Sequence, residues 1–200
     1  MGGEKSMRNI SHGWSSIFLM ILVVVCGCGE ASGSADDTGV EGRSLTTLEG
    51  DLLSQVNAER TASGLPTLVR DTTLDRIMLW YGQDMQTNHH VGHTDANSRG
   101  AQDRVRYYGG STSVLCSEIT QWRTDESGVE HYQGYQGDSD NQSTYMEIGD
   151  YSLGPTSIVG VVGISGKGPT GTEFSETDGS YSGILLCDTA VSLVIDPFSE

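Results

Sequence analysis

Four apolar residues recur at helical spacing shortly after residue 45: Leu48, Leu52, Leu53 and Val56. This spacing predicts a helix with one buried face. Thr46 and Glu49 have the spacing of a capping box, in which each side chain accepts a hydrogen bond from a backbone N–H group at the helix start. Gly64 and the Leu65-Pro66 pair predict the end of the helix, because proline cannot continue it.

A second apolar stripe predicts a helix that begins between Asp71 and Thr73 and fades near Asn88. Its members are Leu74, Ile77, Met78, Tyr81 and Met85. Residues 89–110 are polar and contain glycine, so we expect a loop that includes a short helix at residues 102–107.

The apolar pattern changes in the second half of the chain. Residues 114–122 fit either a strand or a short helix, and residues 124–150 have no convincing period. Residues 158–164 form a β-rich run, which a turn-rich stretch at residues 165–182 follows.

Two further apolar runs, at residues 183–186 and 190–195, predict short strands. Helices therefore come first along the chain and strands come last. This order predicts an α+β domain in which helices pack on a central antiparallel sheet.

The N-terminal segment has the three zones of an export signal. Lys5 and Arg8 give it a basic start, residues 17–25 are apolar without interruption, and a cysteine-containing segment follows. The apolar run has about half of the roughly 20 residues that a membrane-spanning helix needs. We therefore interpret residues 1–27 as a signal peptide.

The residues after the apolar run indicate the type of signal. Val25 and Gly27 resemble the −3 and −1 positions of a lipobox, which makes Cys28 the expected lipid-anchored N-terminus of the mature chain. The alternative is an ordinary secretory signal that leaves Cys28 as a free thiol. Residues 28–44 are rich in Gly, Ser and Asp and are expected to form a flexible tether, followed by a folded domain at residues 45–200. Gly29, directly after the cysteine, resembles an address for the outer membrane of the cell envelope.

Charge excludes one class of partner. The chain has 11 basic and 27 acidic residues and a net charge of −16. Such a surface repels phosphate backbones, so we expect no nucleic-acid partner. The partners that remain are the membrane, reached through lipid on Cys28, and an unidentified protein, glycan or small molecule.

If Cys28 is acylated, the mature chain has one pair of cysteines left, Cys116 and Cys187. In an oxidising compartment the simplest prediction is a disulfide between them. The alternative is two buried free thiols.

Several segments between residues 52 and 119 occur in an order known from one protein family. They are Val56-Asn57-Ala58-Glu59-Arg60, Gly64-Leu65-Pro66-Thr67-Leu68, Asp71 with Leu74, Asp84-Met85, Gly92-His93-Thr94-Asp95, Arg104 with Gly109, and Cys116-Ser117-Glu118-Ile119. The series resembles the CAP superfamily, also called SCP-like, which includes cysteine-rich secretory, antigen-five and pathogenesis-related proteins. The resemblance implies an α-β-α sandwich.

The resemblance also implies a cleft. In the family, one histidine and one glutamate face a shallow cleft together with a second histidine from a later helix, and the set can hold a divalent metal. His93 and Glu118 match the first two positions. The second half departs from the family: Ile119 stands where an asparagine is usual, and no histidine follows His131, which comes too early to be a confident substitute. The family's later helix therefore has no counterpart, although residues 145–147 lie near where it would be.

Two ligands do not make a tight zinc site, because zinc sites in proteins use three or four ligands. We therefore expect no cofactor, at most weak metal binding at His93 and Glu118, and no catalytic residue. His89 and His93 have the spacing of a zinc-protease helix, but His90 stands where the catalytic glutamate belongs. The family resemblance implies a non-enzymatic envelope module that binds a protein, a glycan or a small apolar ligand. The alternative is a weak metal-dependent hydrolase that uses His93 as ligand, with Glu118 or Glu147 as base.

Overall fold

The computed structural model describes residues 43–109, 112–124, 127–146 and 158–199. All of them belong to the unit that spans residues 37–200. The expected signal peptide, the expected lipid anchor at Cys28, most of the expected tether and Glu147 lie outside the described residues.

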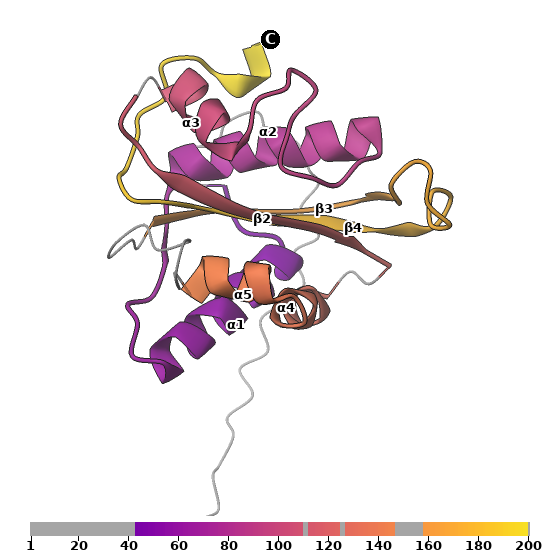
Figure 1. The fold of residues 1–200 in the computed structure, drawn as a ribbon, viewed down its shortest axis with the longest axis horizontal. Helices are drawn as coiled ribbons and strands as arrows, with labels where there is room; N and C mark the ends of the chain where they lie inside the picture. Colours follow the sequence, from indigo (N-terminus) through magenta and orange to yellow (C-terminus); the bar gives the residue numbers. More distant parts are fainter. Residues whose placement is uncertain (1–42, 110–111, 125–126, 147–157, 200) are drawn as a thin grey trace, which may run out of the picture. The chain divides into compact units, whose positions relative to one another are not determined.

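A four-stranded sheet forms the centre of this unit (Figure 1). Its strands are β1 (Val69–Arg70), β2 (Cys116–Arg123), β3 (Ile158–Lys167) and β4 (Asp178–Cys187), in the order β1-β3-β4-β2. The three long strands pair antiparallel, as expected, and the two-residue β1 adds a parallel pair with β3. The α+β class is therefore confirmed, with a sheet that is mixed at one edge.

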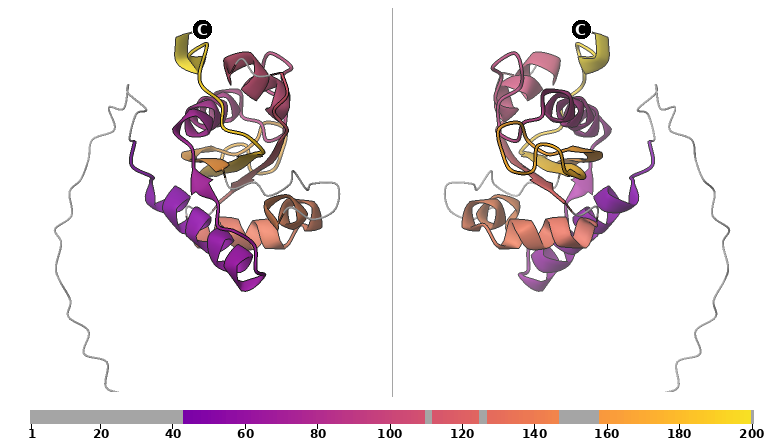
Figure 2. Two further views of the ribbon diagram at one scale, coloured as in Figure 1. Left: turned by 90° about the vertical axis from the view of Figure 1, so that its left-hand side faces the viewer. Right: turned by 90° about the vertical axis from the view of Figure 1, so that its right-hand side faces the viewer.

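Helices cover both faces of the sheet, which gives the expected three-layer sandwich (Figures 1 and 2). One face carries α2 (Thr72–Asn88) and α3 (Ala101–Gly109). The other carries α1 (Thr47–Ala62), α4 (Gly128–Gln136) and α5 (Ser139–Met146). A short 3-10 helix, η2 (Pro197–Ser199), lies next to α2 at the end of the described chain. No helix among the described residues is long and apolar enough to cross a membrane.

The first two helices begin and end where local chemistry predicts. In α1, the Glu49 amide donates to Thr46 Oγ1 at 3.3 Å, and the Thr46 amide donates to Glu49 Oε2 at 2.9 Å. The helix stops before Gly64, whose φ of +76° is the left-handed conformation that glycine adopts easily. In α2, Asp71 is the N-cap and accepts from the Leu74 amide.

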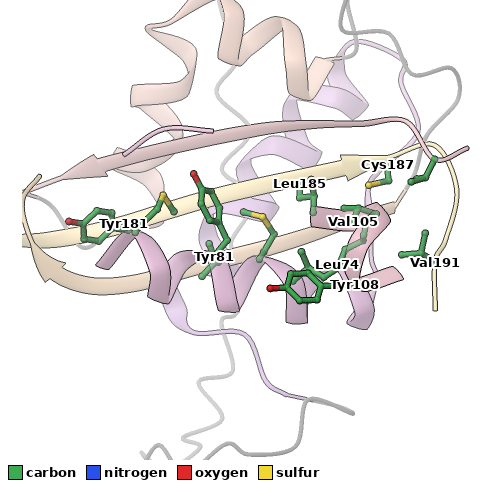
Figure 3. Close-up of a cluster of buried hydrophobic side chains, with 13 residues drawn as sticks. Leu74, Tyr81, Val105, Tyr108, Tyr181, Leu185, Cys187 and Val191 are labelled. Carbon is green, nitrogen blue, oxygen red and sulfur yellow. The ribbon is translucent and has the colours of Figure 1, made fainter. Parts of the chain in front are cut away.

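Each face of the sheet has its own apolar core. Figure 3 shows the core under α2 and α3, to which Leu74, Tyr81 and Val105 contribute from the helices and Leu185 from β4. The core on the other face includes Leu52 of α1. Helix α2 lies close to β3, because a Cβ atom at Gly160 would lie 2.4 Å from the Leu74 carbonyl carbon. This contact explains a glycine inside a buried strand.

Two predictions for the second half of the chain were wrong, and one stretch without a predicted structure contains helices. Residues 124–150 show no period, yet they contain α4 and α5, whose buried side includes Tyr132, Tyr135 and Tyr145 among polar residues. The turn-rich stretch at residues 165–182 is shorter than predicted, since β3 runs to Lys167 and β4 begins at Asp178.

Residues 190–195 do not form a strand. The Val194 and Ile195 amides instead donate to the Tyr108 carbonyl at the end of α3. Val191 packs against Gly109, where an added Cβ atom would lie 3.0 Å from it. The segment therefore covers α3 and adds nothing to the sheet.

Candidate functional site

The structure brings the two residues of the expected cleft together. His93 lies in the loop after α2 and Glu118 lies on β2, and His93 Nδ1 is 3.3 Å from Glu118 Oε2. Their surroundings differ sharply: the His93 side chain is 63% exposed, whereas that of Glu118 is 1% exposed. The histidine is therefore accessible to a ligand, whereas the carboxylate is buried behind it.

Glu118 has a stronger partner inside the protein. Arg104 of α3 is fully buried and donates from Nη2 to Glu118 Oε1 in an ion pair. Its guanidinium also lies over the Tyr81 ring, 3.5 Å from the ring centroid, a cation–π contact. The buried charge of Glu118 is therefore compensated by an arginine.

Arg104 also shapes the loop that carries the histidine. Its Nη1 atom donates to the His93 carbonyl at 3.3 Å and to the Arg99 carbonyl at 3.0 Å. Tyr81 and Thr120 both donate from their hydroxyl groups to the Gly92 carbonyl at 2.7 Å. The backbone on both sides of His93 is thus fixed by side chains from α2, α3 and β2.

The pair changes the acid–base behaviour of its histidine. The hydrogen bond to Glu118 raises the pKa of His93, and partial burial opposes this shift only in part. Burial also raises the pKa of Tyr81, so this hydroxyl remains a hydrogen-bond donor over the whole physiological range. The cleft therefore combines an accessible histidine whose pKa is raised with a buried carboxylate that is paired with arginine.

The described residues give His93 and Glu118 no third side chain that would complete a metal site. Within the parts of the chain that the structure describes, no group of three or more His, Cys, Asp and Glu side chains is placed to hold one. His90 lies near the loop but makes its closest polar contacts to the Thr94 carbonyl, at 3.3 Å, and to Asp84, at 3.8 Å. The expectation of weak metal binding at His93 and Glu118 stays a prediction.

His131 lies on the opposite face of the sheet from His93. It is fully buried on α4, with Nδ1 2.7 Å from Ser182 Oγ and Nε2 2.9 Å from Ser180 Oγ. The Gln121 amide donates to the His131 carbonyl at 2.6 Å. These contacts place the ring in a polar pocket of the interior, so it does not replace the missing second histidine of the cleft.

A polar cluster that the sequence did not reveal surrounds Glu59 of α1. Its carboxylate accepts hydrogen bonds from Tyr132 and Tyr145 at 2.6 Å, from Gln142 at 2.9 Å and from Gln136 at 3.4 Å. Burial raises the pKa of Glu59, but these four hydrogen bonds outweigh it and hold the pKa below its ordinary value. Tyr145 lies near where the family's later helix would be, so a tyrosine bound to Glu59 occupies this part of the chain.

The predicted disulfide is present. Cys116 and Cys187 are joined and form the first residue pair of the β2–β4 ladder. The bond ties the start of β2 to the end of β4, two residues before Glu118.

Comparison with known proteins identifies the fold. No family model matches the sequence, and no curated protein sequence matches it. Among solved structures, an outer surface protein from Borrelia burgdorferi is similar over 70% of this chain and 90% of its own, with a TM-score of 0.52 and 18% identity. An extracellular protein from Bacillus anthracis that contains an SCP domain is similar over 70% of this chain and 40% of its own, with a TM-score of 0.50 and 15% identity. The SCP-like fold expected from the sequence is confirmed.

Proposed function

We propose that this chain is an exported, lipid-anchored CAP-like module that binds a partner in the cell envelope and does not catalyse a reaction. The observation that carries this proposal is the buried ion pair between Arg104 and Glu118. In this pair, Arg104 binds the carboxylate that a metal-dependent hydrolase of this fold would need as ligand or base.

Charge explains why this pair argues against metal catalysis. A divalent cation at Glu118 would have to approach the Arg104 guanidinium, and like charges repel strongly where both are buried. If Glu118 turned toward the cation, Arg104 would keep an uncompensated charge in the interior. His93 alone offers one nitrogen ligand, which is too few for a tight site.

Three observations support an exported, anchored location. The order of basic, apolar and cysteine-containing segments at residues 1–28 is typical of a lipoprotein signal. The disulfide between Cys116 and Cys187 is typical of an oxidising compartment. The two solved structures with the same fold are described as an outer surface protein and an extracellular protein.

Calorimetric titration with zinc tests the absence of catalytic metal. We expect no binding in the micromolar range, either to the native protein or to a His93→Ala variant. His90→Ala is the matched control, because this histidine belongs to the same loop and does not contact Glu118. Micromolar binding that His93→Ala abolishes and His90→Ala preserves would support the metal-dependent hydrolase instead.

Membrane fractionation of two cysteine variants tests the anchor. Cys28→Ser is expected to release the protein from the membrane fraction, because the acylated residue is lost. Cys26→Ser is the matched control and should remain in the membrane fraction, since this cysteine follows Val25, a residue bulkier than those usual before the acylated cysteine. Retention of the Cys28→Ser protein in membranes would show that the lipobox interpretation is wrong.

A further inference from the structure

A partly exposed aromatic surface lies on α2 and α3, and its rings take no part in the contacts described so far. It consists of Trp80 of α2, Arg99 of the following loop, Tyr107 of α3 and Phe198 of η2, and we call it the Trp80 surface. Tyr107 and Phe198 are 43% and 38% exposed, and both count among the large apolar side chains that the protein leaves in solvent. Grouped exposed aromatic rings in a protein mark a binding site more often than isolated ones do.

Two hollows meet at Trp80. The smaller has a volume of about 260 Å³ and is lined by Trp80 and Phe198 together with the polar side chains of Gln83, Asp84, Thr87 and Asn88. The larger has a volume of about 690 Å³ and is lined by Trp80, Asn97, Arg99 and Tyr107. The Trp80 indole therefore lines both hollows, which suits a ligand built from repeated units.

Contacts of Arg99 hold the aromatic rings of the Trp80 surface in place. The Arg99 guanidinium lies over the rings of Trp80, Tyr107 and Tyr108, at 5.3, 4.5 and 4.8 Å from their centroids. It also donates to Asp95 at 2.9 Å and to the Tyr108 hydroxyl at 2.8 Å. Rings that are fixed before binding lose little conformational freedom when a ligand arrives, which favours affinity.

The smaller hollow, at Phe198, is built in the same way. Arg76 lies 5.0 Å from the centroid of the Phe198 ring and pairs with Asp196 at 2.6 Å. On both sides, an arginine supports an aromatic ring while an aspartate compensates its charge. Neither arginine is therefore free to attract an anionic ligand.

We propose that the Trp80 surface binds a neutral oligosaccharide, with one sugar ring in each hollow. A pyranose ring has an apolar C–H face, which packs on an aromatic ring, and hydroxyl groups at its edge that both donate and accept hydrogen bonds. The amide side chains of Gln83 and Asn97 supply donors and acceptors of this kind around the rings. The net charge of −16 disfavours acidic glycans. This inference rests on the proposed function, because it names the ligand class of the binding module.

A proline-rich peptide is another ligand that packs on tyrosine and tryptophan rings. The hollows favour the sugar, because the side chains beside their aromatic rings include the amides of Gln83 and Asn97 and the hydroxyl of Thr87. Sugar hydroxyls use both the donors and the acceptors of such groups, whereas the proline rings use neither.

Tryptophan fluorescence and calorimetry with two probes, the hexamers of N-acetylglucosamine and of β-1,4-linked glucose, test the proposal. We expect at least one hexamer to bind the intact mature domain and its monomer to bind at least tenfold more weakly. Trp80→Ala should weaken hexamer binding at least tenfold, and Tyr107→Ala several-fold. Tyr107 is exposed, so this variant retains the fold even if Trp80→Ala unfolds. Phe174→Ala is the matched control, because this 42% exposed ring packs on Trp122 and lines neither hollow.

The outcomes separate the two proposals. If neither hexamer binds, or if Tyr107→Ala and Phe174→Ala behave alike, the glycan proposal is overturned while the binding module stands. Tyr107-dependent binding of a proline-rich peptide without hexamer binding would overturn it in favour of a peptide ligand. Shortened sugars, detected by mass spectrometry after the titration, would instead overturn the non-enzymatic function.

Discussion

The two faces of the central sheet bury polar groups in different ways. Under α2 and α3, the polar centre is an ion pair in which Arg104 compensates Glu118. Under α1, α4 and α5, the buried His131 contacts the side chains of Ser180, Ser182 and Gln121, and the buried ion pair of this side, between Arg43 and Glu49, lies at the start of α1. Glu59, at the border of this second face, is held by neutral tyrosine and glutamine donors.

This difference relates to what each face presents to solvent. The ion pair fixes the loop that carries both His93 and Arg99, and thus supports the cleft and the Trp80 surface. The polar groups on the other face link α1 and α4 to each other and to the sheet. We infer that the first face is organised around binding and the second around assembly of the fold.

The largest effect is expected from breaking the ion pair. Arg104→Met leaves Glu118 as an uncompensated buried charge, which costs about 3–5 kcal/mol of unfolding free energy. Urea denaturation measures this loss. The double variant Arg104→Met with Glu118→Leu is the control and should recover most of it, because no charge is left unpaired. A loss below about 1 kcal/mol in the single variant would contradict the assigned role of the pair.

A smaller loss is expected from removing the buried histidine of the other face. His131→Ala opens a cavity and deprives the Ser180 and Ser182 hydroxyls of a partner, which costs about 2–3 kcal/mol. Thermal and urea unfolding both report it. His90→Ala, at a partly exposed histidine after α2, is the control with the same chemical change and should cost less than His131→Ala, because less of its side chain is buried. Equal losses in the two variants would remove the distinction between the faces.

The smallest effect concerns Glu59 and depends on pH. Its pKa is below the ordinary value in the folded protein, so its stabilising contribution is fully present above the unfolded pKa and is lost as pH falls through the folded pKa. Glu59→Gln should therefore lower the unfolding free energy by about 1 kcal/mol at pH 7, and this difference should shrink below about pH 4. Glu173→Gln, in the exposed β3–β4 connection, is the control and should show no such trend. If the difference in unfolding free energy between the native protein and Glu59→Gln stays constant from pH 7 to pH 3, the prediction is wrong.

Local features of the fold could be predicted because their causes lie within a few residues. Thr46 and Glu49 are three positions apart, and Asp71 caps a helix whose apolar stripe is visible in the sequence. His93 and Glu118 could be paired because a family resemblance supplied the long-range information. The disulfide followed from counting cysteines, which needs no geometry.

The sequence by itself determined the first two helices, the two main β runs, the cysteine pair and the acidic character of the domain. Only the tertiary structure decided which polar groups become buried and which groups bind them. Arg104 meets Glu118 across α3 and β2, and Glu59 meets Tyr145 across α1 and α5. Helices α4 and α5 escaped prediction for the same reason: their tyrosines are buried because distant polar groups satisfy their hydroxyls. A local pattern records apolar burial, but the hydrogen bonds that make polar burial favourable join residues far apart in the chain.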